Sequence, residues 1–375
     1  MSNSIARKYF LVVNVDWFFL SHRLELALKM KSEGYDVFIL TKNSGRREEI
    51  EQHGLKFINI DFERSGKNPL KELALVTELK RLYKHHRPAI IHHVTIKPAI
   101  YGSIAAKGLT GTKVVNAISG LGFNFIEGRD GLVQKLLRRL MKYAFSKNVN
   151  FIFQNPDDQQ LYRQMGFLKN NKHCLIKGAG VDAEKYTYVL PQPKARIVVV
   201  VTARMLYDKG IAEFIAAAGI LKEKWQDKAT FLLAGDIDLA NPAGIPEAVI
   251  KASLIDDYLC WIGYSKNVQQ LLIDADIACL PSYREGLPKS LIEAMAVGRP
   301  IVTTNVPGCR ECVDEGVNGF LVPAKDATSL ASALERLLAD EHLRAKMGEQ
   351  SREKMVRELS LEKVLKDTIA FYESI

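Results

Sequence analysis

The sequence predicts an α/β protein built from two Rossmann-like, doubly wound domains. Three observations support this prediction: the chain has 375 residues, short apolar runs alternate with helical patterns in both halves, and the alternation is interrupted once, near Pro191 and Pro193. A chain of this length exceeds what one hydrophobic core usually organises. Strands that alternate with helices are typical of parallel sheets covered on both faces. We therefore expect two domains of similar size.

Short apolar runs in the first half predict buried parallel strands, and the segments between them show helical spacing of apolar residues. The expected strands are residues 9–15, 37–40, 55–60, 89–92 and 114–117, and the expected helices are residues 22–32, 70–85 and 97–107. We assign residues 1–186 to this first domain.

The linker is expected in residues 186–194, because the two prolines discourage both helix and central strand. A second alternating series follows, and we assign residues 187–357 to the second domain. Its expected strands are residues 197–201, 230–233, 258–262, 277–280 and 300–302, and its expected helices are residues 210–223, 246–253, 268–273 and 290–297. The helical pattern over 341–372 is too long for this domain alone, so residues from about 358 to 375 are a candidate to pack back on the first domain.

Composition limits the classes of partner. A formal charge of +9 favours anionic partners such as nucleic acid, an anionic membrane surface or phosphorylated substrates. No basic stripe interleaved with aromatic residues on a known module is present, so we expect no nucleic-acid partner. No apolar stretch approaches the roughly 20 residues that span a bilayer. Any membrane contact is therefore expected to be peripheral.

Five scattered cysteines favour reduced thiols and a cytoplasmic location. Cys309 and Cys312 form a lone C-x-x-C, which lacks the second pair that a zinc site needs, and we interpret them as loop thiols.

Neither half carries the G-x-G-x-x-G fingerprint of dinucleotide binding after its first strand. The second half instead carries Arg204 and Lys209 around a strand-to-helix turn. Ligands of open α/β sheets bind at the carboxyl ends of strands, and a helix N-terminus favours anions. Two cations there could hold a diphosphate, although taken alone they could also be solvated surface residues.

A second motif spans residues 281–294, after an apolar strand and into a helix. Gly286 permits close approach of the backbone to a ligand, and Ser290 can cap the helix or donate to an anion. Glu285 lies in the loop and Glu293 about one turn inside the helix, so the two carboxylates would reach different parts of one ligand.

Together with Gly235 and the segment 318–322, these residues resemble the retaining family 4 of glycosyltransferases, which have the GT-B fold of two Rossmann-like domains facing across a cleft. The resemblance covers nearly the whole chain and is strongest over 197–338. It implies that Arg204 and Lys209 hold the donor diphosphate, that Glu285 contacts the donor sugar, and that Glu293 binds the ribose. It also implies that backbone groups around Ser290 and Leu291 help to hold the phosphate, and that Gly263 and Tyr264 border the base. Gly286 is a further expected donor-binding residue. Glu285, Arg204 and Lys209 are the expected catalytic residues.

The first domain is expected to bind the acceptor. Similar enzymes often carry a His after a first-domain strand, but Ser119 stands here, followed by Gly120 and Gly122 as backbone contacts to donor or acceptor. Further acceptor-side candidates at strand ends are His22, Arg23, Thr95 and Lys97. Each of these four could equally be a solvated or capping residue.

The resemblance implies transfer of a sugar from a UDP-sugar to a hydroxyl of a glycan acceptor. We predict that the sugar is N-acetylhexosamine or galactose. The most similar enzymes are bacterial ones of lipid-linked oligosaccharide or surface polysaccharide assembly, which suggests a polyprenyl-diphosphate-linked acceptor. The alternatives are a GT-B-like UDP-sugar epimerase and a catalytically silent nucleotide-sugar-binding subunit. Asp236 and Asp238 form D-x-D, but we interpret them as loop residues beside the nucleotide, and we expect neither a metal nor another cofactor.

Residues 132–144 predict a basic amphipathic helix, with four cations at positions 135, 138, 139 and 142. Such a helix can lie against an anionic membrane, which would place the protein at the inner face of the cell membrane. The alternative is a domain helix whose apolar side packs on the sheet and whose cations are solvated.

Overall fold

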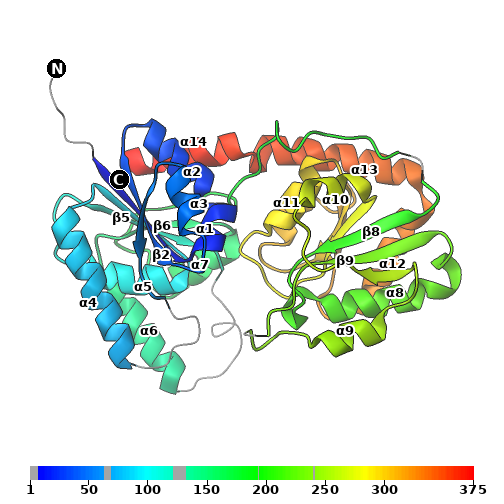
Figure 1. The fold of residues 1–375 in the computed structure, drawn as a ribbon, viewed down its shortest axis with the longest axis horizontal. Coiled ribbons are helices and arrows are strands. Elements are labelled where there is room, and N and C mark those ends of the chain that lie inside the picture. The colour runs from blue at the N-terminus through cyan, green and yellow to red at the C-terminus, as the bar shows by residue number, and fades with distance from the viewer. Residues whose placement is uncertain (1–6, 63–68, 121–131, 193, 240) are drawn as a thin grey trace. The chain divides into compact units, whose positions relative to one another are not determined.

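The computed structural model describes residues 7–62, 69–120, 132–192, 194–239 and 241–375 (Figure 1). It contains two compact units, Met1–Ala179 with Leu365–Ile375, and Gly180–Val364. Each unit has a parallel sheet with helices on both faces. The predicted class of two doubly wound α/β domains is therefore confirmed.

The first unit has a seven-stranded sheet in the order β3-β2-β1-β4-β5-β6-β7, and all of its pairs are parallel. Its strands are β1 (Lys8–Val15), β2 (Asp36–Lys42), β3 (Lys56–Asn59), β4 (Ile90–Val94), β5 (Lys113–Ile118), β6 (Asn150–Phe153) and β7 (His173–Leu175). Its helices are α1 (Asp16–His22), α2 (Leu24–Ser32), α3 (Arg47–Gln52), α4 (Pro69–His86), α5 (Ile96–Ala105), α6 (Leu132–Ala144) and α7 (Pro156–Gln164).

Consecutive residues of β1 point to opposite faces of this sheet, as strand geometry requires. Phe10 packs toward α4, with its ring centroid 6.1 Å from that of Tyr83. Tyr9 points to the opposite face of the sheet. Its hydroxyl forms a 2.9 Å hydrogen bond with the hydroxyl of Tyr372 in α14 (Leu361–Ser374), and either hydroxyl can be the donor. The end of α14 is thereby fixed to the first sheet.

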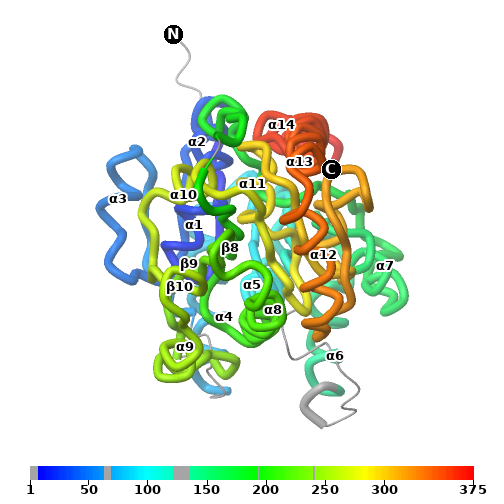
Figure 2. Tube along the Cα trace, turned by 90° about the vertical axis from the view of Figure 1, so that its right-hand side faces the viewer, coloured from blue at the N-terminus to red at the C-terminus, as the bar shows by residue number. Residues whose placement is uncertain are grey.

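The second unit has a six-stranded parallel sheet in the order β10-β9-β8-β11-β12-β13. Its strands are β8 (Ile197–Thr202), β9 (Ala229–Ala234), β10 (Leu259–Trp261), β11 (Ile277–Leu280), β12 (Ile301–Thr304) and β13 (Gly319–Val322). Its helices are η2 (Tyr207–Lys209), α8 (Ile211–Trp225), α9 (Glu247–Ser253), α10 (Val268–Asp274), α11 (Lys289–Ala296), η3 (Arg310–Cys312), α12 (Ala327–Ala339), α13 (Glu341–Lys354) and η4 (Met355–Leu359). Helices α8 and α12 pack together, as do α10 with α11 and α11 with α13 (Figure 2).

Three features differ from the sequence-based expectation. A helix begins at Asp16, directly after β1, and ends at His22, where a helix was expected to begin. The elements α3, β6, α7, β7, β13 and α12 were not predicted as a strand or helix. The expected long helix over 341–372 is divided into α13, the π-helix η4 and α14, because Ser360 is extended, with φ −66° and ψ 148°.

Among the described residues, no helix combines the length and the apolar character that crossing a membrane would require.

Candidate functional site

The predicted donor residues gather at the carboxyl edge of the second sheet. Arg204 follows β8, Gly263 follows β10 and Glu285 follows β11, while Glu293 lies inside α11. Parallel strands end at the same edge, so segments distant in sequence meet there.

The turn that carries Arg204 is held by backbone hydrogen bonds on both of its sides. The Met205 N–H donates to the carbonyl of Asp236 over 2.9 Å, and the Ile245 N–H donates to the carbonyl of Met205 over 3.0 Å. Gly235 makes this packing possible, since a Cβ there would lie 1.8 Å from the carbonyl oxygen of Ala203. The turn is therefore preorganised before any ligand binds.

Both predicted diphosphate cations form ion pairs. Arg204 Nη1 pairs with Asp238 Oδ2, and Lys209 Nζ pairs with Glu285 Oε1. The Arg204 side chain is 40% exposed, whereas that of Lys209 is 23% exposed, so Lys209 lies in the drier of the two environments. A diphosphate that binds these cations must share them with, or take them from, the two carboxylates.

Glu285 is positioned by its own loop and by the loop after β12. Its Oε1 accepts a 2.7 Å hydrogen bond from Ser282 Oγ, and its N–H donates to the carbonyl of Pro307 over 3.1 Å. Gly308 has φ +83°, and a Cβ there would lie 2.5 Å from the carbonyl oxygen of Glu285. These contacts fix the carboxylate beside Lys209.

Glu293 is 9% exposed and has two partners. Tyr186 donates to its Oε1 over 3.1 Å, and Lys289 Nζ lies 3.2 Å from the same atom. Burial and the neighbouring Glu293 raise the pKa of the Tyr186 hydroxyl, so that group stays a donor. Ser290 and Leu291 lie in the same first turn of α11, and the Leu291 N–H donates to the carbonyl of Pro288 over 3.1 Å.

The remaining donor candidates border this edge. Gly286 is buried in the loop beside Glu285. Gly263 has φ +66°, and its carbonyl accepts a 2.7 Å hydrogen bond from the Gly235 N–H. Tyr264 is 64% exposed, so its ring is accessible to a flat ligand such as a base.

The nearby cysteines are buried. Burial raises the pKa of the Cys309 thiol to about 12, and the charge of Glu285 adds to the effect, so this thiol is a poor nucleophile or metal ligand. Over the part of the chain that the structure describes, no group of three or more His, Cys, Asp and Glu side chains is placed to hold a metal ion.

Of the acceptor-side candidates, Thr95 and His22 lie at strand or helix ends of the first unit. Thr95 has φ +73°, a strained value for a β-branched residue, and its hydroxyl donates to Asn14 Oδ1. His22 stacks on Phe18 with ring centroids 4.2 Å apart, and its Nδ1 lies 2.6 Å from Ser21 Oγ.

Arg23 differs from these, because it is only 6% exposed. It lies near Tyr9 and Tyr372, and burial lowers the pKa of its guanidinium. Its Nη1 donates to the carbonyl of His22 over 3.3 Å. The guanidinium is therefore enclosed near two tyrosine hydroxyls, and its contact with an acceptor stays a prediction.

Lys97 also has a partner within the first unit, Glu72 Oε1 of α4, at 2.8 Å. Ser119 and Gly120 follow β5 and are half-buried, with Gly120 at φ +105°. Gly122 lies outside the described residues.

Sequence reasoning did not assign the residues that hold the donor candidates in place. Asp238 was noticed only as a member of D-x-D, and Tyr186 only as part of the linker. Asp238 lies 34 residues from its partner Arg204, and Tyr186 lies 107 residues from its partner Glu293, so no local pattern could reveal these contacts.

Two family models and several known proteins are similar to this chain. Residues 182–354 match the family model "Glycosyl transferases group 1", and residues 8–155 match "Glycosyl transferase 4-like". The chain is 29% identical over 355 residues to a Campylobacter jejuni N,N'-diacetylbacillosaminyl-diphospho-undecaprenol alpha-1,3-N-acetylgalactosaminyltransferase, covering 89% of this chain and 92% of the relative. It is 23% identical over 350 residues to an Escherichia coli UDP-Gal:alpha-D-GlcNAc-diphosphoundecaprenol alpha-1,3-galactosyltransferase, covering 89% and 88%.

Solved structures share the fold. A sucrose-phosphate synthase from Thermosynechococcus elongatus superposes with a TM-score of 0.81 at 20% identity, covering 98% of this chain and 99% of the other. Anabaena HepE in complex with UDP and glucose gives a TM-score of 0.78 at 18% identity, covering 98% and 100%.

Proposed function

Because the chain belongs to the family 4 glycosyltransferases of the GT-B fold, we propose that it transfers a sugar from a UDP-sugar to a polyprenyl-diphosphate-linked glycan. The donor sugar proposed is N-acetylhexosamine or galactose, and the reaction proposed retains the anomeric configuration. The names of the Campylobacter jejuni and Escherichia coli relatives support this choice of acceptor and donor.

The observation that carries the donor assignment is the Lys209–Glu285 ion pair. It brings a cation suited to phosphate and a carboxylate suited to hydroxyl groups side by side at one sheet edge. A sugar diphosphate has this same sequence of groups, an anion followed by a ring of hydroxyls. Glu293 lies one helix turn beyond the loop, where the ribose hydroxyls could donate to it.

In the proposed reaction the acceptor hydroxyl attacks the anomeric carbon from the face that UDP leaves. The new C–O bond forms as the bond to the β-phosphate oxygen breaks, and that oxygen takes the proton of the acceptor hydroxyl. Arg204 and Lys209 would stabilise the negative charge that develops on the diphosphate. Glu285 would orient the sugar, and its negative charge would favour the positive charge at the anomeric carbon.

The test is to incubate the purified protein and a bacterial membrane lipid extract with radiolabelled UDP-N-acetylgalactosamine, UDP-N-acetylglucosamine or UDP-galactose. We expect label from one donor to enter the lipid fraction, and NMR of the released glycan to show an α linkage. Interconversion of the nucleotide sugars without any acceptor would indicate an epimerase. UDP binding with no turnover of any donor would indicate a silent binding subunit.

We further propose that α6 holds the protein against an anionic membrane in the cytoplasm. Its apolar side packs inward, since Met141 and Ala144 are fully buried and Leu137 and Leu140 pack against the core. The outer side combines exposed cations with two exposed apolar residues, Leu136 at 68% and Tyr143 at 58%. The exposed cations are Lys135, Arg138, Arg139 and Lys142.

Each cation near an anionic bilayer contributes about 1 kcal/mol, an attraction that salt screens. Flotation with phosphatidylglycerol vesicles at low and high salt tests the proposal. A variant with all four cations changed to Gln should float less at low salt, and the difference should shrink at high salt. Equal flotation of the two proteins would exclude this helix from membrane binding.

A further inference from the structure

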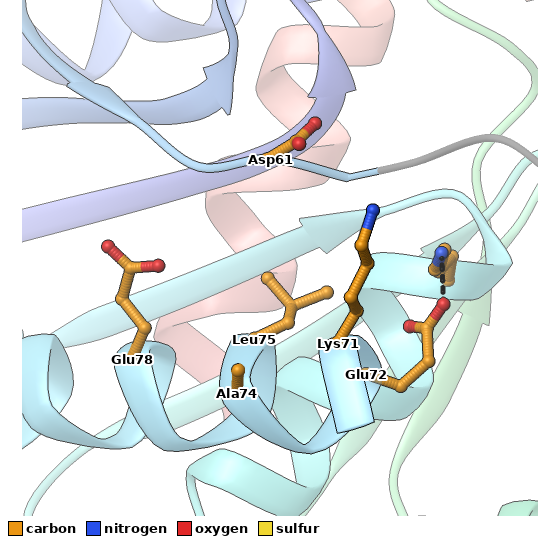
Figure 3. A pocket seen from close by; sticks show the side chains of 7 residues that line it. Asp61, Lys71, Glu72, Ala74, Leu75 and Glu78 are labelled. Carbon is orange, nitrogen blue, oxygen red and sulfur yellow. Dashed lines mark hydrogen bonds and ion pairs between the residues drawn. The ribbon is translucent and has the colours of Figure 1, made fainter. Parts of the chain in front are cut away.

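A pocket of about 260 Å³ lies beside the first three turns of α4 in the first unit (Figure 3). Lys71, Leu75 and Glu78 point from α4 toward Asp61, which follows β3. Lys97, at the start of α5, completes the lining with Glu72 and Ala74. The pocket therefore lies at the carboxyl ends of β3 and β4, the edge at which open α/β sheets bind ligands.

The polar groups of this pocket are mostly acceptors of hydrogen bonds. Glu72 Oε1 is paired with Lys97 at 2.8 Å, and burial together with the neighbouring Glu72 carboxylate raises the pKa of the Tyr101 hydroxyl. Glu72 Oε2 is buried and forms no well-aligned hydrogen bond with a described residue. A buried carboxylate oxygen without a donor is unfavourable by roughly 1–3 kcal/mol. The pocket thus contains a preformed position for a ligand that donates a hydrogen bond.

Two further carboxylates and an apolar floor narrow the class of ligand. Asp61 is held by Lys42 at 2.8 Å, and Glu78 lies on the exposed side of α4. Leu75 is 6% exposed and, with Ala74, supplies an apolar surface. A sugar ring offers the matching groups, hydroxyl donors at its edge and C–H groups on its face. The volume is below the ~300–1,000 Å³ usual for drug-sized ligands, which suits a single sugar residue.

A diphosphate fits this pocket poorly. Three carboxylates face two lysines, and Lys97 is already neutralised by Glu72. An incoming anion would have to break that pair, whose side chains are only 20% and 17% exposed, and would leave Glu72 without its counterion.

We propose that this pocket binds a neutral sugar residue of the acceptor glycan, with a sugar hydroxyl or N-acetyl N–H donating to Glu72 Oε2. The assignment of that sugar to the acceptor rests on the proposed function, whereas the binding of a neutral sugar does not. The N-terminal turns of α4 and α5 would then contact the acceptor glycan and select its sugar, and the lipid diphosphate would bind outside this pocket.

The direct test is saturation-transfer NMR with methyl N-acetyl-α-galactosaminide and methyl α-galactoside, without donor or lipid. We expect binding of at least one glycoside to the wild-type protein and at least fivefold weaker binding to Glu72→Gln. Glu78→Gln changes an exposed lining residue and should weaken binding less. It provides a second test of the pocket if Glu72→Gln does not fold. Glu33→Gln is the matched control, because Glu33 forms an ion pair with Lys29 at 2.7 Å on α2, away from the pocket lining.

Calorimetric titration with UDP separates this proposal from the proposed function. Glu72→Gln should bind UDP as the wild-type protein does, and in the transfer assay its KM for acceptor should rise while its KM for donor stays unchanged. Glycoside binding that is equal in Glu72→Gln, or that inorganic diphosphate displaces, would overturn the sugar assignment. Glycoside binding at the pocket without any transfer would retain the site and overturn only the proposed reaction.

Discussion

Arg204 and Lys209 each lie against a carboxylate, so a bound diphosphate competes with part of the protein for its cations. We expect Arg204→Ala and Lys209→Ala each to weaken UDP binding by about ten- to a hundredfold, which corresponds to charge-assisted hydrogen bonds of roughly 1.5–3 kcal/mol. The loss should be larger for Lys209, because its ion pair is less exposed to water. Isothermal titration calorimetry with UDP measures both losses.

Lys224→Ala is the matched control for these variants. Lys224 also pairs with a glutamate, Glu335 at 2.8 Å, but on the exposed side of α8. Its removal should leave UDP affinity unchanged. Wild-type affinity in both Arg204→Ala and Lys209→Ala would remove these residues from the diphosphate site.

The two carboxylates of the 285–293 motif occupy different environments, which predicts different kinetic effects. Glu285→Gln should mainly lower kcat, because Glu285 lies beside Lys209 where the reacting sugar is proposed to bind. Glu293→Gln should mainly raise the KM for donor through weaker ribose bonds. Steady-state kinetics with varied donor separates these effects, and equal changes in KM alone would contradict the division of roles.

At the scale of elements, one glycine sets the distance between the Lys209 turn and the Glu285 loop. Gly210 has φ +71°, and a Cβ there would lie 2.0 Å from the carbonyl oxygen of Pro281. Gly210→Ala must therefore move one of the two segments, and we expect it to lower the free energy of unfolding by about 1–3 kcal/mol and to weaken UDP binding. Urea denaturation and calorimetry measure the two effects.

Gly219 provides the contrasting substitution within α8. A Cβ at Gly219 would meet no atom within 4 Å, so Gly219→Ala should raise the free energy of unfolding by about 0.5–1 kcal/mol. If Gly210→Ala proved as stable as Gly219→Ala, the close approach at Pro281 would have no energetic consequence.

The sequence predicts some elements better than others for physical reasons. Strands such as β1, β8 and β11 are continuous apolar runs, and their helices follow at regular intervals. Length does not explain why β6 and β7 were missed, because β10 and β11 are equally short and were predicted. Asparagine and glutamine flank the apolar residues of β6, and Lys172 and His173 precede those of β7, so neither strand stands out as an apolar run. Helix α7 carries mostly polar residues. The break at Ser360 was missed because both flanking helices keep a helical pattern.

The same distinction holds for the candidate site. The placement of Arg204, Lys209 and Glu285 at one sheet edge could be predicted because each lies in a segment that follows a strand the sequence reveals, and Glu293 could be placed in the helix after the same loop. Their partners could not, since Asp238 and Tyr186 meet them only through the folding of the sheet. The pocket around Glu72 was missed for a further reason: its residues come from three separate elements and form no motif.

At the scale of the whole molecule, the two units should respond differently to acid. Seven of the eight histidines lie in the first unit, and only His342 lies in the second. Burial lowers the pKa of His93 to about 4 and lowers that of His92 well below its ordinary value. Between pH 6.5 and about 4 the unfolded chain therefore binds protons that the folded first unit does not.

The buried neutral histidines therefore contribute to the free energy of unfolding of the first unit. We expect this contribution to be fully present above pH 6.5 and to be lost as the pH falls toward 4. His93 alone accounts for roughly 3 kcal/mol at 1.36 kcal/mol per pKa unit. Scanning calorimetry at pH 7 and pH 5 should show one transition shifting to lower temperature more than the other. His93→Gln should reduce that shift and His342→Gln should not, and parallel shifts of both transitions in every variant would contradict the prediction.

The attachment of α14 to the first sheet has a consequence for synthesis. Residues 180–364 leave the ribosome before residues 365–375, although the latter belong to the first unit. At about 5–20 residues per second, roughly 10 to 40 seconds pass between the two pieces. During that interval Tyr9 and His92 lack the hydroxyl of Tyr372, and the Lys113 ammonium lacks the Tyr372 carbonyl to which it donates. The first unit therefore begins to leave the ribosome first but is completed last. A nascent chain halted near residue 364 would expose the partners of Tyr372 on the first sheet to chaperones.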